Sequence, residues 1–184
     1  MGKRYEAITP ELAGWIAAQP VFFVATAPLA ASGHVNVSPK GLDTLRVLEP
    51  LHIAYLDLTG SGAETIAHVR ENGRIVLMFC AFGGAPKIVR LHGEGTVLTS
   101  DSAGWAKLRS RFPEHMGARA IIDVRVTRIS DSCGYGVPTF AAAEDRVALP
   151  RWTANKGAEG LRTYRREHNS RSIDGLPALE SSDA

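Results

Sequence analysis

Cysteine is scarce in this chain, which has only Cys80 and Cys133 among its 184 residues. Two cysteines are too few for a disulfide scaffold, so the sequence favours a reducing compartment and we expect a cytoplasmic protein. No apolar run approaches the roughly 20 residues that a membrane-spanning helix needs. No apolar segment follows the basic residues near the N-terminus, as a secretory signal would require. The sequence therefore predicts neither membrane insertion nor export.

Net charge is also low, +2 at pH 7, and gives no reason to expect a nucleic acid partner. The basic residues nevertheless gather in two places. The set Lys107, Arg109 and Arg111 is typical of the solvent-exposed face of a helix. The second set has two interpretations, because it either covers a solvent-exposed face in the same way or reaches an anionic ligand. Its members are Arg162, Arg165, Arg166 and Arg171.

Motifs for metal binding and for nucleophilic catalysis are lacking. The histidines are scattered, and neither a His-x-x-x-His nor a Cys-x-x-Cys spacing occurs, so no metal site is expected. The chain has no P-loop, no dinucleotide fingerprint of three spaced glycines and no Gly-x-Ser-x-Gly elbow. No residue is an evident general acid or base. The catalytic residue, if there is one, is therefore unknown from the sequence.

The most informative stretch runs from Leu51 to Phe79. Its pattern predicts a strand over 51–58, a glycine-rich turn, a short helix ended by Asn72-Gly73, and a second strand over 75–79. The turn, Thr59-Gly60-Ser61-Gly62, would place N–H groups and hydroxyls at a helix N-terminus. The helix dipole and the unpaired donors favour an anion such as a phosphate there. The same residues are also compatible with an ordinary turn and helix cap.

The remaining pattern is mainly β. Further strands are predicted at 21–26, 34–38, 44–48, 87–99 and 120–129, and helices before Pro20, around Trp105 and Leu108, and over 160–167. Glycines within 87–99 indicate a bulge or bend. No repeat or linker divides the chain, so residues 1–184 are predicted to form one domain, an antiparallel barrel with flanking helices. Residues from about 173 to 184 are predicted to be a flexible tail.

An ordered set of segments resembles one protein family. In chain order they are NVSPKG, YLDLTGSGAETIAHVRENGRIVLMF, KIVRLHGEG, CGYGVP and NSRSIDGLP. Together they resemble the pyridoxamine 5′-phosphate oxidase-like family of flavin-binding proteins, over roughly residues 5 to 178. The likeness is greater to the broad group of FMN-binding relatives than to the oxidase that makes pyridoxal phosphate. The resemblance implies a mainly β (α+β) fold, a six-stranded antiparallel split β-barrel with flanking helices, and a homodimer with two FMN sites at the subunit interface.

The resemblance also implies a set of cofactor-binding residues, at positions that match the family's strand ends, phosphate turn and later barrel strand. The set is Asn36, Ser38, Lys40, Gly41, Ser61, Thr65, Asn72, Lys87, Arg90 and Trp152. The segment from Asn169 to Ser172 would approach the active site of the partner subunit.

The sequence departs from the family in one respect. Many relatives place an Arg or Lys one helical turn in, where this chain has Ala63-Glu64-Thr65. A phosphate would be repelled by Glu64 unless that side chain points away. Either Lys40 and Arg90 supply the positive charge instead, or the site binds weakly.

The resemblance favours an FMN-dependent oxidoreductase that passes hydride or electrons between a nicotinamide or other donor and a small substrate. Two alternatives remain open: a flavin or haem carrier or sensor without turnover, and a reductase that uses a deazaflavin. In each case the redox chemistry belongs to the cofactor, which the protein binds, orients and tunes.

Overall fold

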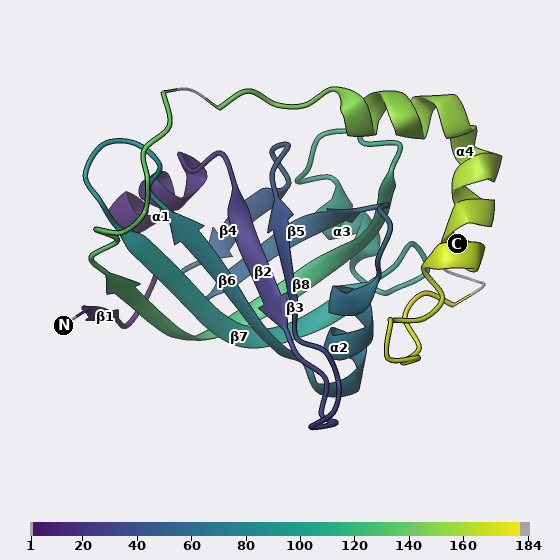
Figure 1. Ribbon diagram of the computed structural model, residues 1–184, viewed down its shortest axis with the longest axis horizontal. Coiled ribbons are helices and arrows are strands. Elements are labelled where there is room, and N and C mark those ends of the chain that lie inside the picture. The colour runs from purple at the N-terminus through teal and green to yellow at the C-terminus, as the bar shows by residue number, and fades with distance from the viewer. Residues whose placement is uncertain (1, 142, 181–184) are drawn as a thin grey trace.

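The computed structural model describes residues 2–141 and 143–180 and consists mainly of one antiparallel sheet (Figure 1). Its strands are β1 (Arg4–Tyr5), β2 (Phe22–Thr26), β3 (Asn36–Lys40), β4 (Leu45–Glu49), β5 (His52–Leu58), β6 (Arg74–Cys80), β7 (Ile88–Leu98) and β8 (Ala118–Ser132). The helices are α1 (Pro10–Ala17), α2 (Glu64–Asn72), α3 (Trp105–Arg109) and α4 (Ala148–His168). The strand order is β3-β2-β6-β7-β8-β5-β4, and β1 pairs with β8.

The sheet curls into a split barrel. Strands β3 and β4 lie at opposite ends of the strand order, yet only residues 41–44 join them, so the two edges must approach each other. Leu42 and Asp43 in this link have φ values of 61° and 54°, a left-handed conformation that side chains rarely adopt. The predicted mainly β split barrel with flanking helices is confirmed, although the sheet has eight strands among the described residues where the resemblance implied six. The structure adds the strand β1, which at two residues is too short to leave a pattern in the sequence.

The core fills the inside of the barrel, because alternate residues of each strand point inward. In β7, Val89 and Leu91 are buried whereas Ile88 and Arg90 lie on the outer side. A predicted bend in this strand is present, since the β7–β8 register shifts between His92 and Gly93. A Cβ at Gly93 would lie only 2.4 Å from the carbonyl oxygen of Arg125, so no other residue fits there without a shift.

The helices cover the barrel from outside. Helix α1 begins at Pro10, with the Thr9 hydroxyl accepting a hydrogen bond from Leu12 N, as predicted. Helix α2 ends at Gly73, whose φ of 72° terminates it. Helix α4 lies apart from the sheet in Figure 1 and starts twelve residues before the predicted 160–167, because two helices join across a kink at Gly157. Within the described ranges, no helix has the length and apolar character needed to cross a membrane.

The segment after α4 folds back onto the barrel. Leu179 N donates to Asn169 O at 3.0 Å, and Ala178 and Leu179 are buried in the main core. This segment includes residues 173–180, for which the sequence predicts flexibility. Residues 181–184 lie outside the described residues.

Candidate functional site

A buried ion pair lies beside the glycine-rich turn that joins β5 to α2. Arg119 Nε contacts Asp57 Oδ2 at 2.7 Å, and Lys40 Nζ contacts Asp57 Oδ1 at 2.9 Å. Burial alone would raise the pKa of the Asp57 carboxyl, but Arg119 and Lys40 outweigh it and hold that pKa at about 2. The carboxylate therefore stays charged at neutral pH and fixes both cations.

The same guanidinium holds the turn in place. Arg119 Nη2 donates to Gly62 O at 2.8 Å, and its Nη1 donates to Asn169 Oδ1 at 2.8 Å. The Asn169 amide in turn donates to Gly60 O at 3.0 Å. Two carbonyl groups of the turn are thus satisfied from the protein side. The backbone N–H groups of Gly60, Ser61, Gly62 and Ala63 have no acceptor among the described residues, and no side chain caps α2.

A third cation reaches this turn from α4. Arg165 Nε donates to Thr59 Oγ1 and its Nη2 donates to Ala118 O, each at 3.0 Å, so both bonds go to neutral acceptors. Burial, followed by the neighbouring guanidinium groups of Arg119 and Arg162, lowers the pKa of Arg165. Arg119 and Arg165 therefore contact the turn itself, and Lys40 is tied to its start through the buried carboxylate of Asp57. This excess of positive charge favours an anion.

Glu64, the residue that weakens the family resemblance, remains close to the turn. Its Oε1 would lie 3.6 Å from a Cβ placed at Gly62. The carboxylate accepts the backbone N–H of Ile173 at 3.1 and 3.2 Å, which ties it to the C-terminal segment. With Glu64 counted, the surroundings of the turn still carry one more positive than negative charge.

Two buried hydroxyl groups lie among these strands without partners. Ser38 Oγ and the Tyr55 hydroxyl are buried and have no hydrogen-bond partner among the described residues. Burial, and then the charge of Asp57, raises the pKa of Tyr55 well above its ordinary value. Unpaired buried hydroxyl groups are costly, and they are expected where a ligand or water supplies the missing hydrogen bond.

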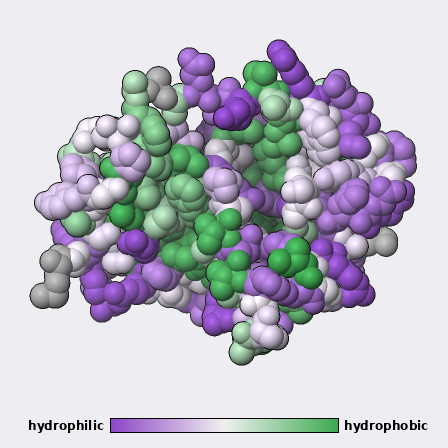
Figure 2. Space-filling model, viewed as in Figure 1, coloured by the Kyte–Doolittle hydropathy of each residue, from purple (hydrophilic) through white to green (hydrophobic). Residues whose placement is uncertain are grey.

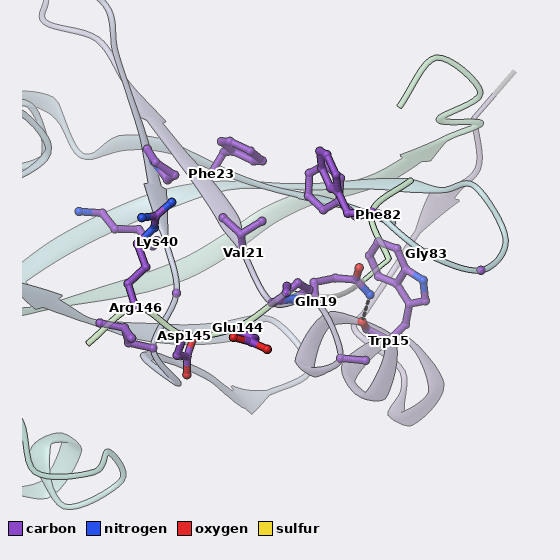
Figure 3. A pocket seen from close by; sticks show the side chains of 18 of the residues that line it. Trp15, Gln19, Val21, Phe23, Lys40, Phe82, Gly83, Glu144, Asp145 and Arg146 are labelled. Atoms are coloured by element: carbon purple, nitrogen blue, oxygen red, sulfur yellow. Dashed lines mark hydrogen bonds between the residues drawn. The ribbon is translucent and has the colours of Figure 1, made fainter. Parts of the chain in front are cut away.

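A cavity of about 1100 Å³ begins at Lys40 and extends over the outer side of β2. Figure 3 shows Lys40 and Arg146 at one end of it and Trp15 and Phe82 at the other. Val21 and Phe23 line the wall between them. One end of the cavity is thus charged, with Lys40 and Arg146 near the carboxylates of Glu144 and Asp145, and the other end is aromatic, which suits a planar ring system that carries polar groups.

The outer surface of β2 and β3 is apolar and exposed. Val35 and Val37 are 70% and 61% exposed, and Phe23 faces outward beside Pro39 in the β2–β3 register. In Figure 2, hydrophobic atoms gather over β2, β3 and β6, whereas the region of α4 is largely hydrophilic. Exposed apolar surface of this kind is typical of an interaction site.

The structure brings together several of the residues that the sequence singled out. Asn36 Nδ2 donates to Thr65 Oγ1 at 3.0 Å, which joins β3 to the first turn of α2. Ser38 and Lys40 follow Asn36 on the same side of β3. Gly41 lines the cavity next to Lys40, and Ser61 is exposed in the turn.

Four other predicted residues lie elsewhere. Asn72 donates to Ala27 O at the far end of α2, about 12 Å along the helix from its start. Lys87 lies 5.1 Å from the Trp15 ring centroid, next to the aromatic end of the cavity. Arg90 is on the outer side of β7, where it donates to Ser132 Oγ. Trp152 packs edge-on against Tyr164 within α4.

Sequence reasoning missed Asp57 and Arg119. Each stands among apolar neighbours, Asp57 in YLDL and Arg119 in ARAII, and a charge at a buried strand position requires a partner. That signal could have indicated a buried ion pair without identifying its members. Arg165 was one of four arginines with two open interpretations, and it is the one that reaches the turn. Asn169, which belongs to the segment that the resemblance placed near a partner's active site, contacts Arg119 and Gly60.

No group of three or more His, Cys, Asp or Glu residues suited to a metal ion occurs in the described part of the chain. The site is therefore described by its cations, hydroxyl groups and free N–H groups.

Comparison with known proteins adds the family context. Residues 8–133 match the sequence profile of the pyridoxamine 5′-phosphate oxidase family. The pyridoxamine 5′-phosphate oxidase family protein UstO of Aspergillus flavus is 41% identical over 197 residues, covering 96% of this chain and 78% of UstO. Among solved structures, HupZ of Group A Streptococcus has a TM-score of 0.54 at 22% identity and covers 73% of this chain and 99% of its own. A Lactobacillus delbrueckii protein named for pyridoxamine 5′-phosphate oxidase has a TM-score of 0.52 at 20% identity. The match covers 69% of this chain and 98% of that protein. These structural likenesses concern the fold.

Proposed function

The chain belongs to the pyridoxamine 5′-phosphate oxidase family, and from that premise we propose that it is an FMN-dependent oxidoreductase that acts as a homodimer in the cytoplasm. The observation that carries this proposal is the excess of positive charge at an uncapped helix turn, together with a partly aromatic cavity that begins at Lys40, the partner of Asp57. A flavin mononucleotide has matching chemistry, because it joins a dianionic phosphate to a planar, largely apolar ring.

The residues present fit the two ends of that cofactor. The free N–H groups of Ser61 and Gly62, the Ser61 hydroxyl and the Lys40 ammonium would hold the phosphate. Val21 and Phe23 offer an apolar wall for the ring. The cavity, at about 1100 Å³, is at the upper end of the roughly 300–1,000 Å³ of ordinary ligand sites, so it has room for a second molecule beside the ring.

The protein's own contribution is positioning. Asp57 holds the Lys40 ammonium at 2.9 Å, so this cation is oriented before any ligand arrives. Val21 and Phe23 would shield one face of the ring from water. FMN, when bound, supplies the transfer of hydride or electrons between a donor, such as a reduced nicotinamide, and the substrate.

The homodimer is supported by the apolar outer surface of β2 and β3. Val35 and Val37 are exposed there, and the cavity opens along the same strands. A second copy that packs on this surface would cover the open side of the cavity. Light scattering coupled to gel filtration checks the assembly, and replacement of Val37 by Asp is expected to produce a monomer.

Absorption spectroscopy of the purified protein, with mass spectrometry of whatever is released on denaturation, tests the cofactor. We expect a flavin spectrum, or saturable binding of added FMN with a rise in Tm. Lys40→Met is expected to weaken FMN binding at least 10-fold, because a charge-assisted hydrogen bond is lost, while the exposed Lys107→Met has no effect. No flavin as purified and no response to excess FMN would overturn the proposal.

The same titration separates the other functions. Tighter binding of a deazaflavin than of FMN would identify a deazaflavin-dependent reductase. Tight binding of flavin or haem without steady-state oxidation of reduced nicotinamide would identify a carrier or sensor.

A further inference from the structure

The C-terminal segment supplies part of the turn's surroundings although it lies beyond the family profile, which ends at residue 133. Arg165 and Asn169 both follow that boundary, and both contact residues of the β5–α2 turn. The chain thus adds a cation and an amide to a turn that lacks the Arg or Lys of many relatives.

We propose that Arg165 and Asn169 make this turn selective for a phosphate monoester: Arg165 is a second cation, besides Lys40, that contacts the phosphate, and Asn169 is the positioning residue that orients the turn. The inference rests on the proposed flavin site and names the part of the chain that distinguishes phosphorylated from unphosphorylated ligands.

Arg165 is distinguished from its neighbours on α4 by its contacts. Arg162 pairs with Glu159, and Arg166 donates to Thr163 Oγ1, both on the exposed side of the helix. Arg165 is half-buried, bonds only neutral oxygen atoms and has no acceptor for Nη1 among the described residues. Burial, and then the guanidinium groups of Arg119 and Arg162, lower the pKa of Arg165, and no carboxylate among the described residues bonds Arg165 itself. A bound phosphate would supply that anion.

Asn169 acts through the backbone of the turn. Its side chain is fully buried, and it uses both ends, accepting from Arg119 Nη1 and donating to Gly60 O. Together with the bond from Arg119 to Gly62 O, this holds the carbonyl groups of the turn toward the protein. The N–H groups of Ser61 and its neighbours are left free for a ligand. Loss of Asn169 would leave Gly60 O unpaired and release this orientation.

The segment that carries these residues is anchored to its own barrel. Ile173 N donates to the Glu64 carboxylate, and Asp174 pairs with His34 in the β2–β3 connection. Leu179 is buried in the main core. Arg165 and Asn169 therefore reach the turn of the same chain.

The test compares the dissociation constants of FMN and riboflavin, which differ only in the phosphate. Arg165→Gln is expected to weaken FMN binding about 10-fold or more and to leave riboflavin within twofold. Asn169→Ala is expected to weaken FMN binding more than riboflavin binding. The ratio of the riboflavin dissociation constant to that of FMN should therefore fall, as it does in Arg165→Gln. Arg166→Gln, an exposed arginine on the same helix, serves as the matched control and is expected to change neither value.

Inorganic phosphate provides a readout that does not depend on flavin. It is expected to raise the Tm of the unaltered protein and of Arg166→Gln, but not that of Arg165→Gln. Equal weakening of FMN and riboflavin by Arg165→Gln, or the same loss in Arg166→Gln, would overturn the inference. If the protein binds neither flavin, the proposed function fails. The phosphate experiment then tests the inference by itself. The inference is contradicted if phosphate does not raise the Tm of the unaltered protein. If Asn169→Ala does not fold, Arg165→Gln remains decisive.

Discussion

Arg119 and Asp57 form an ion pair of 2.7 Å in which both side chains are almost completely buried. Taking two charges out of water is costly, and their attraction offsets that cost only when the remaining hydrogen-bonding groups are satisfied. Here Lys40 takes the second oxygen of the carboxylate, while Gly62 O and Asn169 Oδ1 take the rest of the guanidinium. The pair therefore fixes the geometry of the turn.

Replacement of Asp57 by Asn should destabilise the protein strongly, because it leaves Arg119 buried without a counter-charge. We expect the free energy of unfolding in urea at pH 7 to fall by about 3–5 kcal/mol. Asp145→Asn, which changes an exposed carboxylate of the same type, is the control and should stay within about 0.5 kcal/mol. A similar loss in both variants would contradict this assignment.

The pH dependence of stability should report the same carboxylate. The Asp57 pKa falls from 3.8 to about 2 on folding, so the unfolded chain binds the proton more tightly. The stabilisation is therefore fully present above pH 3.8 and is lost as the pH falls toward 2. Unfolding curves of the unaltered protein at several acidic pH values should show this loss, and Asp57→Asn should lack that component. If the unaltered protein and Asp57→Asn lose stability in the same way at acidic pH, Asp57 is not the source of that loss.

Replacement of Glu64 by Gln should strengthen anion binding, since it removes the acid that lies beside Gly62. The group is partly exposed and screened, so we expect a modest gain in FMN affinity of up to about fivefold. Titration calorimetry measures it, with the exposed Glu6→Gln as a control of the same charge change. Weaker binding in Glu64→Gln would indicate that its bond to Ile173 N matters more than its charge.

The contact between His34 and Asp174 should make the C-terminal loop sensitive to pH. The hydrogen bond to Asp174, and then the charge of that carboxylate, raises the pKa of His34. The stabilisation of the loop by the His34–Asp174 contact is fully present below the ordinary His pKa of about 6.5. It is lost as the pH rises through the raised pKa of His34. Hydrogen exchange of residues 172–176, corrected for its intrinsic pH dependence, should therefore be faster at alkaline pH. Asp174→Asn should remove this difference.

Replacement of Gly93 by Ala should destabilise the barrel, because the new Cβ would lie 2.4 Å from Arg125 O and 2.8 Å from Val124 Cγ1. We expect a loss of about 1–3 kcal/mol in the free energy of unfolding. Gly83→Ala adds the same methyl group where no atom lies within 4 Å and should have little effect. Equal stability of the two variants would show that the β7–β8 approach relaxes easily.

The mainly β architecture, the family and the order strand, turn, helix, strand around residues 51–79 could all be predicted from local sequence patterns and from the resemblance. These features depend on periodicity and on turn residues, which act over a few neighbouring positions. Gly73 and the bend at Gly93 belong to the same class, because each glycine marks a local backbone requirement. The resemblance also singled out Lys40, which the structure places in an ion pair with Asp57.

Which charged side chains lie near the β5–α2 turn depends on how distant parts of the chain pack, so it could not be read from the sequence. Asp57 and Arg119 are 62 positions apart, and Arg119 and Asn169 are 50 apart. The β5–β8 register, in which Asp57 lies opposite Ala120, brings the first two together. The packing of α4 places Asn169, at the C-terminal end of that helix, beside Arg119. Such contacts depend on how distant elements pack, and no local pattern distinguishes an arginine that will be buried against a carboxylate from one that will remain in solvent.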